Sequence, residues 1–376
     1  MSEVRLTLSA SGVQLSGPAA CELSLPWLRS HCSCRECVSA SGQRLVGRFG
    51  LNASLREASL SPDERWLVLA WQDGHVSQFS LREILQWSAR RGRAVPFGMA
   101  SRRALGLSRR RFSDAAGAGV AEWLELLADN QVLLLEGVPP EPEQVVRVAR
   151  QIAPVLPTIY DESWFVTAEG GDTNIAYTAL ELPPHQDLSA YEAPPGVQLL
   201  HCLRFDADVR GGESTFVDAL AAAEELQSSA PAEFQTLCEV WATFDKINAR
   251  QAMTIRKPHV RLDDFGNIVE LNWAPPFEGP YAGPGEREAD YARAYAAFSA
   301  AVARAPRLEL RLQPGELLMF LNRRTLHGRR AFAPGTGPAG GRVLQGCYLS
   351  LDDVANAWRR LERAAASTLV ESRSDT

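Results

Sequence analysis

The sequence predicts a mainly β protein with helical insertions, built as two domains, of which the larger has a β-sandwich or barrel core. Three observations support this fold class. The chain has 376 residues, more than one hydrophobic core usually organises. Short apolar runs, each bounded by turn residues, recur through its second half. Two longer segments, near residues 219–240 and 285–305, have the pattern of helices inserted between those runs.

Residues 1–95 are predicted to form a small β-rich domain. The run at 4–8 alternates between apolar and polar residues, as in a half-buried strand. The apolar runs at 66–71 and 76–79 flank Gln72-Asp73-Gly74, and an Asp-Gly step is a strong signal for a β-hairpin. The N-terminal domain is therefore expected to contain a hairpin at this turn.

A short helix is expected at 81–87, and a linker at 96–112 follows it. The linker carries many arginines but little periodic apolar pattern, so we interpret it as a solvated spacer on the surface rather than a nucleic-acid contact. The remaining residues, 113–376, are predicted to form the larger domain.

The larger domain is expected to open with a helix that Ser113 or Asp114 caps. Further helices are expected at 142–152 and 352–365. Buried strands are predicted at 132–135, 197–203, 214–217, 268–273, 317–321 and 343–349.

Charge and composition narrow the class of protein. The formal net charge of −6 disfavours nucleic acid or an anionic membrane as the main partner. We see neither a targeting signal nor an apolar run of about 20 residues that would span a bilayer, and therefore expect a cytoplasmic protein. The seven cysteines are an odd number without a secretion signal, which favours reduced thiols.

The His185-Gln186-Asp187 motif predicts a metal site. Residues two apart in an extended segment point to the same side, so His185 and Asp187 can bind one ion. His327 can supply a third ligand once the sheet closes. Two imidazoles and one carboxylate on one face are typical of non-haem iron(II) oxygenases, because three positions stay open. Arg342, if buried nearby, can form a bidentate pair with the distal carboxylate of 2-oxoglutarate.

Other functions are compatible with the same histidines. The three ligands could hold zinc for hydrolysis, although that leaves Arg342 without a role. A non-enzymatic sensor of betaines could also use the site. His201 is expected to be a satisfied core histidine, and His259, which follows a proline in a polar stretch, is expected to be exposed.

The motifs resemble those of the γ-butyrobetaine and trimethyllysine dioxygenases, within the broader taurine-dioxygenase-like group. The resemblance is densest at Asn174-Ile175-Ala176-Tyr177-Thr178, at the His185 motif and at 194–202. It implies a double-stranded β-helix, or jelly roll, as the fold of the catalytic domain. It also implies iron ligation by His185, Asp187 and His327.

The resemblance further implies that Arg342 binds 2-oxoglutarate and that Ser214 touches the same carboxylate. It implies a structural zinc site in the N-terminal domain, with Cys32, Cys34 and Cys37 supplying three thiolates. His75 is favoured as the fourth ligand over His31, which adjoins Cys32 and would strain to share its metal.

A trimethylammonium group cannot donate hydrogen bonds, so aromatic faces must recognise it, with roughly 0.5–2 kcal/mol from each cation–π contact. Tyr160, Trp164, Tyr177 and Tyr348 match the cage positions of the family. Asn174 matches a position that contacts substrate in the family.

The acidic end of the substrate is harder to predict. Ala274 stands where γ-butyrobetaine enzymes carry an asparagine that contacts the carboxylate, and Leu188 replaces a polar residue. The expected substrate is therefore γ-butyrobetaine or the phosphonate analogue 2-(trimethylammonio)ethylphosphonate. Gly346-Cys347-Tyr348-Leu349 looks more like the trimethyllysine branch, so trimethyllysine is an alternative.

The resemblance implies hydroxylation, because halogenating relatives lack the carboxylate that Asp187 supplies. It implies iron(II), the cosubstrate 2-oxoglutarate, dioxygen and a structural zinc, and it suggests ascorbate as an accessory cofactor. The expected partner is a small quaternary ammonium substrate, with no nucleic acid or membrane. A homodimer is expected by resemblance.

Overall fold

The structure is a computed structural model that describes residues 5–9, 11–16, 21–45, 53–63, 65–84, 99, 104–113, 118–167 and 175–374. The chain divides into two compact units, Met1–Arg93 and Ala94–Thr376. Within the described residues, no helix combines the length and the apolar character that crossing a bilayer requires.

Among its described residues, the first unit contains two three-stranded antiparallel sheets, a short helix at 25–30 and helical residues at 81–84. Their elements are β1 (Arg5–Leu8), β2 (Gly12–Ser16), β3 (Cys21–Ser24), α1 (Leu25–Ser30), β4 (Leu55–Leu60), β5 (Trp66–Trp71) and β6 (Val76–Ser80). Val13, Leu28, Leu69 and Trp71 are buried in a core between them. The predicted hairpin is confirmed, since β5 pairs with β6 across a turn in which Gly74 has a φ of +86°. Of the helix expected at 81–87, residues 81–84 are helical and 85–87 lie outside the described residues.

The second unit is built on two sheets. The six-stranded sheet has the order β7 (Gly106–Arg111), β8 (Gln131–Glu136), β19 (Glu316–Leu321), β11 (Val197–Phe205), β22 (Arg342–Leu349) and β9 (Trp164–Val166). The four-stranded sheet has the order β10 (Leu182–His185), β20 (Thr325–Arg329), β13 (Ser214–Asp218) and β18 (Arg307–Leu310). Phe216 of the smaller sheet packs on Phe320 of the larger one, with ring centres 5.1 Å apart. This is the double-stranded β-helix that the resemblance implied.

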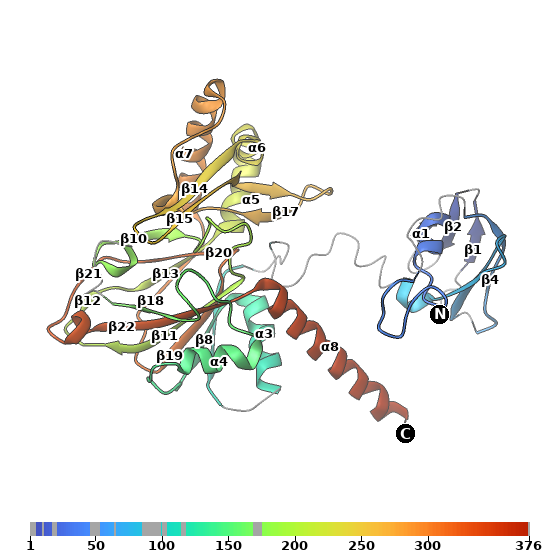
Figure 1. Cartoon of the computed structure of the whole chain (residues 1–376), viewed down its shortest axis with the longest axis horizontal. Helices are drawn as coiled ribbons and strands as arrows, with labels where there is room; N and C mark the ends of the chain where they lie inside the picture. Colours follow the sequence, from blue (N-terminus) through green and yellow to red (C-terminus); the bar gives the residue numbers. More distant parts are fainter. Residues whose placement is uncertain are drawn as a thin grey trace. The chain divides into compact units, whose positions relative to one another are not determined.

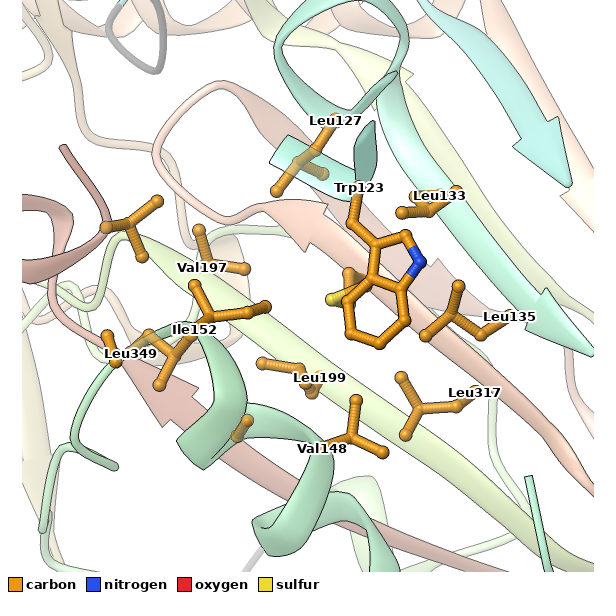
Figure 2. Close-up of a cluster of buried hydrophobic side chains, with 14 of the residues drawn as sticks. Trp123, Leu127, Leu133, Leu135, Val148, Ile152, Val197, Leu199, Leu317 and Leu349 are labelled. Carbon is orange, nitrogen blue, oxygen red and sulfur yellow. The ribbon is translucent and has the colours of Figure 1, made fainter. Parts of the chain in front are cut away.

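The central strands are buried on both faces, which explains why the sequence shows continuous apolar runs instead of alternation. In β8, Val132 and Leu134 face the core between the sheets, whereas Leu133 and Leu135 face the helices. The helical face is covered by α3 (Ala118–Asn130) and α4 (Gln144–Ile152). Figure 2 shows Trp123, Leu127, Val148 and Ile152 of these helices against Leu133, Leu135, Val197, Leu199, Leu317 and Leu349 of the strands.

The helices predicted near 219–240 and 285–305 form a separate layer together with two strand pairs. It consists of α5 (Ala219–Ser229), α6 (Pro231–Glu239), α7 (Glu288–Arg304), the hairpin β14 (Trp241–Ile247) with β15 (Ala252–Pro258), and the pair β16 (Val260–Leu262) with β17 (Ile268–Leu271). The labels α5, α6, α7, β14, β15 and β17 lie near one another in Figure 1. The short pair β12 (Arg210–Gly211) with β21 (Phe332–Ala333) and the 3-10 turns η1 (Ile175–Tyr177), η2 (Pro275–Phe277), η3 (Gly285–Arg287) and η4 (Pro338–Gly341) complete the unit, together with α8 (Leu351–Ser374).

The structure differs from the predicted linker at 96–112. Residues 106–111 form β7, which runs parallel to β8 at the edge of the large sheet. An edge strand has one neighbour and carries charged residues on its exposed side, so it lacks the apolar pattern of a buried strand. The hairpin of β14 and β15 and the strands β18 and β20 were not predicted, because their polar residues conceal the strand pattern.

Candidate active site and metal centres

Pairing of β10 with β20 brings the two histidines of the predicted iron site together. His185 ends β10 and lies directly opposite His327 of β20, with ring centres 4.4 Å apart. Asp187 follows two residues after His185, so its carboxylate reaches both rings. Its Oδ1 is 3.2 Å from Nε2 of His185, and its Oδ2 is 3.5 Å from Nε2 of His327.

The surroundings fix the orientation of these groups. Nδ1 of His185 is 2.9 Å from the carbonyl oxygen of Pro183, which can only accept, so Nδ1 carries the proton and Nε2 is free to bind a metal. The fully buried Asn322 accepts a hydrogen bond from the Asp187 backbone N–H and donates to the Asp187 carbonyl. The protein itself therefore fixes the His185 tautomer and the backbone of Asp187.

Tyr348 adds a contact that the sequence did not reveal. Its hydroxyl donates to Oδ2 of Asp187 at 2.6 Å. Burial alone would raise the pKa of Asp187, but the adjacent histidines hold that pKa well below its usual range. Burial and the Asp187 charge raise the pKa of Tyr348, so its phenol keeps the donated proton. Tyr348 thus contacts the Asp187 carboxylate and also lines the pocket.

The donor atoms of His185, Asp187 and His327 all lie within 4.8 Å of one another, and the three residues line one pocket. Two neutral imidazole nitrogens and a carboxylate form the donor set of non-haem iron(II) oxygenases. Burial lowers the pKa of His327, which favours the neutral form that binds metal. The residues present therefore fit iron(II).

Arg342, the first residue of β22, lines the same pocket with 3% of its surface exposed. Its guanidinium lies 5.5 Å from the Phe205 ring and 5.7 Å from the Phe332 ring, and no described carboxylate forms an ion pair with it. Burial lowers its pKa to about 9, with a further contribution from Arg329. A buried guanidinium in such surroundings fits the carboxylate of a bound ligand. Ser214 lines the pocket as well.

Arg329 is a pocket residue that sequence reasoning missed. It lies two residues after His327 on β20, on the same side of the strand. Its guanidinium donates to the carbonyl oxygens of Ala176, Thr178 and Leu180 at 2.6–2.8 Å. These bonds hold the η1 segment against the pocket. The only sequence feature that could have indicated this position is the spacing, because Arg329 follows His327 by two residues.

The four aromatic residues that the resemblance assigns to a cage all line this pocket: Tyr160, Trp164, Tyr177 and Tyr348. Trp164 stacks on Tyr348 with ring centres 4.2 Å apart, and Tyr160 lies 5.8 Å from Trp164. Asn174 lies outside the described residues.

The positions suggested for the acidic end of the substrate carry no polar side chain. Ala274 is fully buried, and Leu188 is 8% exposed with its backbone in the left-handed region at a φ of 57°. Phe277 of η2 lines the pocket and meets the His185 ring edge-on at 5.6 Å.

In the first unit, Cys32, Cys34, Cys37 and His75 converge. Their sulfur atoms lie 3.2, 3.6 and 3.7 Å from Nε2 of His75. Ligand atoms of a tetrahedral zinc site are about 3.5 Å apart, given typical Zn–S and Zn–N bond lengths. The four residues therefore fit zinc.

Contacts around this cluster support the choice of His75 over His31. Nδ1 of His75 faces the carboxylate of Glu36 at 3.4 Å, an arrangement common behind zinc-bound histidines. His31 instead stacks on Trp27, with ring centres 4.2 Å apart, and its Nδ1 faces the Trp27 carbonyl oxygen.

The two remaining histidines are buried. His201 is a core residue near the backbone of Val138, and burial lowers its pKa to about 4. The expectation that His259 is exposed was wrong. His259 is fully buried, and its nitrogens face the Asn272 carbonyl at 2.7 Å and the Tyr291 hydroxyl at 2.9 Å. The helical insertion covers it, which a polar local sequence could not indicate.

Comparisons with known proteins agree with this geometry. Residues 97–348 match the family described as taurine catabolism dioxygenase TauD, TfdA family, and residues 13–86 match the domain described as gamma-butyrobetaine hydroxylase-like, N-terminal. The chain therefore belongs to the TauD/TfdA family and is an iron(II)- and 2-oxoglutarate-dependent dioxygenase.

Among its relatives, the gamma-butyrobetaine dioxygenase of Pseudomonas sp. (strain AK-1) is 34% identical over 352 residues, which cover 90% of each chain. The mitochondrial trimethyllysine dioxygenase of Rattus norvegicus is 28% identical and covers 89% of this chain and 82% of its own. A solved structure of asparagine oxygenase, 18% identical, superimposes with a TM-score of 0.50 over 62% of this chain and 78% of that chain. This last likeness concerns the fold alone.

Proposed function

We propose that this dioxygenase hydroxylates a small zwitterion that carries a trimethylammonium group. The observation that carries the proposal is the lining of one pocket. The iron ligands His185, Asp187 and His327 stand beside the buried cation of Arg342, and the aromatic set Tyr160, Trp164, Tyr177 and Tyr348 contributes to the same lining. The names of the relatives, gamma-butyrobetaine and trimethyllysine dioxygenases, support this substrate class.

In this proposal, His185, Asp187 and His327 hold iron(II), and Arg342 with Ser214 binds the distal carboxylate of 2-oxoglutarate. When bound, iron and 2-oxoglutarate supply the activation of dioxygen, coupled to conversion of 2-oxoglutarate into succinate and carbon dioxide. Tyr348 holds its proton on the hydroxyl and fixes the orientation of the Asp187 carboxylate.

The aromatic side chains bind and orient the cation in this proposal. A trimethylammonium group is attracted to ring faces, at about 0.5–2 kcal/mol for each ring, depending on desolvation. Arg329 supports the cage, because it anchors the segment that carries Tyr177 through the carbonyl oxygens of Ala176 and Thr178.

In the first unit, we propose that Cys32, Cys34, Cys37 and His75 hold a structural zinc ion. A site with four protein ligands has no position for substrate, so it stabilises the fold and takes no part in the reaction.

A succinate-release assay tests the proposed function. The purified protein with iron(II) and 2-oxoglutarate would be offered γ-butyrobetaine, 2-(trimethylammonio)ethylphosphonate, trimethyllysine and choline-like compounds. We expect turnover of at least one trimethylammonium zwitterion, with a hydroxylated product detected by mass spectrometry. The analogue in which a tert-butyl group replaces trimethylammonium is the matched control. Efficient turnover of that analogue alone, which lacks the cation, would contradict the role of the aromatic cage. Tight binding without succinate would favour a sensor.

A further inference from the structure

A cation at the edge of the pocket has no role in the function proposed above. The Lys246 ammonium of β14 is 5.0 Å from the centre of the Phe277 ring and 5.8 Å from that of the Tyr160 ring. Both rings line the pocket that contains the iron ligands. Lys246 therefore lies beside two rings of the pocket lining, one of which, Phe277, is outside the aromatic set assigned to the trimethylammonium group.

The course of β14 explains this position. Phe244 forms an antiparallel bridge with Glu278, and the Gly279 N–H donates to the Thr243 carbonyl oxygen at 3.0 Å. Two residues further along an antiparallel pair, Lys246 comes opposite the η2 turn. That turn directly follows Ala274, the position at which the relatives were expected to supply a polar side chain.

Lys246 has no acidic partner of its own in the described part of the chain. None of the ion pairs formed there includes it, and the carboxylate that attracts it is Asp187, which is committed to the metal site. Its side chain is partly buried, which lowers its pKa. A partly desolvated ammonium group without an acidic partner costs free energy that an incoming anion would recover.

The contrast with Lys257 strengthens this interpretation. Lys246 and Lys257 are the only lysines among the 39 basic residues of the sequence, and both lie on the β14–β15 hairpin. The Lys257 ammonium donates to the Tyr191 carbonyl oxygen at 3.0 Å and is 7% exposed, so it has a structural role. Lys246 instead lies against rings of the pocket, and a compact ammonium suits a single acidic oxygen.

We propose that Lys246 binds the acidic group of the substrate and thereby selects trimethylammonium compounds whose far end carries net negative charge. The inference rests on the proposed function and names its specificity determinant. Lys246 supplies a positive charge for the acidic group, whereas the side chains of Ala274 and Leu188 are apolar. A carboxylate or a phosphonate meets the requirement, whereas the far end of trimethyllysine carries an α-ammonium group that cancels its carboxylate and would stand beside Lys246.

The test compares Lys246→Met with the unaltered enzyme. The reference compound is n-butyltrimethylammonium, which lacks the acidic group. Its Michaelis constant is measured if it is a substrate, and its inhibition constant if it is a competitive inhibitor. The Michaelis constants for γ-butyrobetaine and for its phosphonate analogue are each divided by this reference constant. Charge-assisted hydrogen bonds contribute roughly 1.5–3 kcal/mol, so we expect this ratio to rise at least about tenfold. Lys246→Arg should keep it within about threefold, since the charge remains.

Arg250→Met is the matched control, because it removes one positive charge from the exposed turn of the same hairpin. The ratio should not change in this variant. An unchanged ratio in Lys246→Met, or an equal change in Arg250→Met, would overturn the role of Lys246 while turnover of zwitterions upheld the proposed function. Absence of succinate with every trimethylammonium compound in the unaltered enzyme would instead overturn the proposed function, and the inference with it.

Discussion

Arg342 makes the clearest prediction at the scale of single residues. Its guanidinium is buried between Phe205 and Phe332 without an ion pair among the described residues. Replacement by lysine keeps a charge but removes the planar fork that binds a carboxylate through two bonds. We expect Arg342→Lys to raise the Michaelis constant for the cosubstrate by about tenfold to a hundredfold, because such bonds are worth roughly 1.5–3 kcal/mol.

Steady-state succinate formation at varied cosubstrate concentration measures this effect. Arg330→Lys is the control, since Arg330 is exposed and pairs with Glu309 at 2.9 Å. Equal Michaelis constants for Arg342→Lys and Arg330→Lys would remove 2-oxoglutarate binding from the roles of Arg342.

Tyr348 makes two contacts that one substitution can separate. Tyr348→Phe keeps the ring that stacks on Trp164 but removes the hydroxyl that donates to Asp187. Groups that orient a metal ligand typically affect metal affinity by about 10–100-fold, so we expect iron(II) to bind about tenfold more weakly. The Michaelis constant for the substrate should change less, because the ring remains.

Iron titration under anaerobic conditions measures the affinity, and Tyr348→Leu serves as the comparison that also removes the ring. If Tyr348→Phe and Tyr348→Leu weakened substrate binding equally and left iron affinity unchanged, the hydrogen bond to Asp187 would not contribute to iron binding.

At the scale of elements, the η2 turn links the pocket to the helical insertion, and the half-buried carboxyl group of Glu278 follows the turn. Glu278 accepts a hydrogen bond from the Ala274 N–H at 3.3 Å, and burial raises its pKa from 4.5 to about 7. The folded protein therefore binds a proton more tightly than the unfolded chain does. The resulting stabilisation is complete below pH 4.5 and is lost as the pH rises through about 7.

We expect the free energy of unfolding contributed by this group to fall between about pH 5 and pH 8, and Glu278→Gln to remove that part of the pH dependence. Chemical denaturation of both proteins at the two pH values measures the difference. An identical pH dependence in the variant would show that Glu278 ionises in the folded protein as it does in the unfolded chain.

At the scale of the whole molecule, the two units have separate cores, and each contains one of the two residue groups that fit a metal ion. Structural zinc sites contribute to folding directly, so removal of one ligand should destabilise the unit that contains it. We expect Cys34→Ser to lose bound zinc and the thermal transition of the first unit. The transition of the second unit and its iron content should remain.

Calorimetry together with metal analysis checks this expectation. Cys238→Ser, which alters a free thiol of α6 far from the cysteine cluster in sequence, should leave the zinc content unchanged. Simultaneous loss of both transitions in Cys34→Ser would contradict the independence of the two units.

The sequence predicted much of the fold where burial on both faces produces apolar runs. The strands around Leu133, Leu199 and Leu318 were identifiable for that reason. Elements at an edge or in the insertion were missed, because β7, β14 and β20 carry arginine, lysine or histidine at positions that only tertiary contacts explain.

By itself, the sequence determined the donor types. His185 and Asp187 are close in the chain, as are Cys32, Cys34 and Cys37, and such local spacing restricts the metal that can bind. Tertiary structure decided which distant groups meet them. Only the pairing of β10 with β20 sets His327 opposite His185, and only the path of β14 past η2 brings Lys246 beside the Phe277 ring. The chemistry of each side chain follows directly from the residue type. Contacts between distant residues depend instead on strand register, which the packing of the whole core determines.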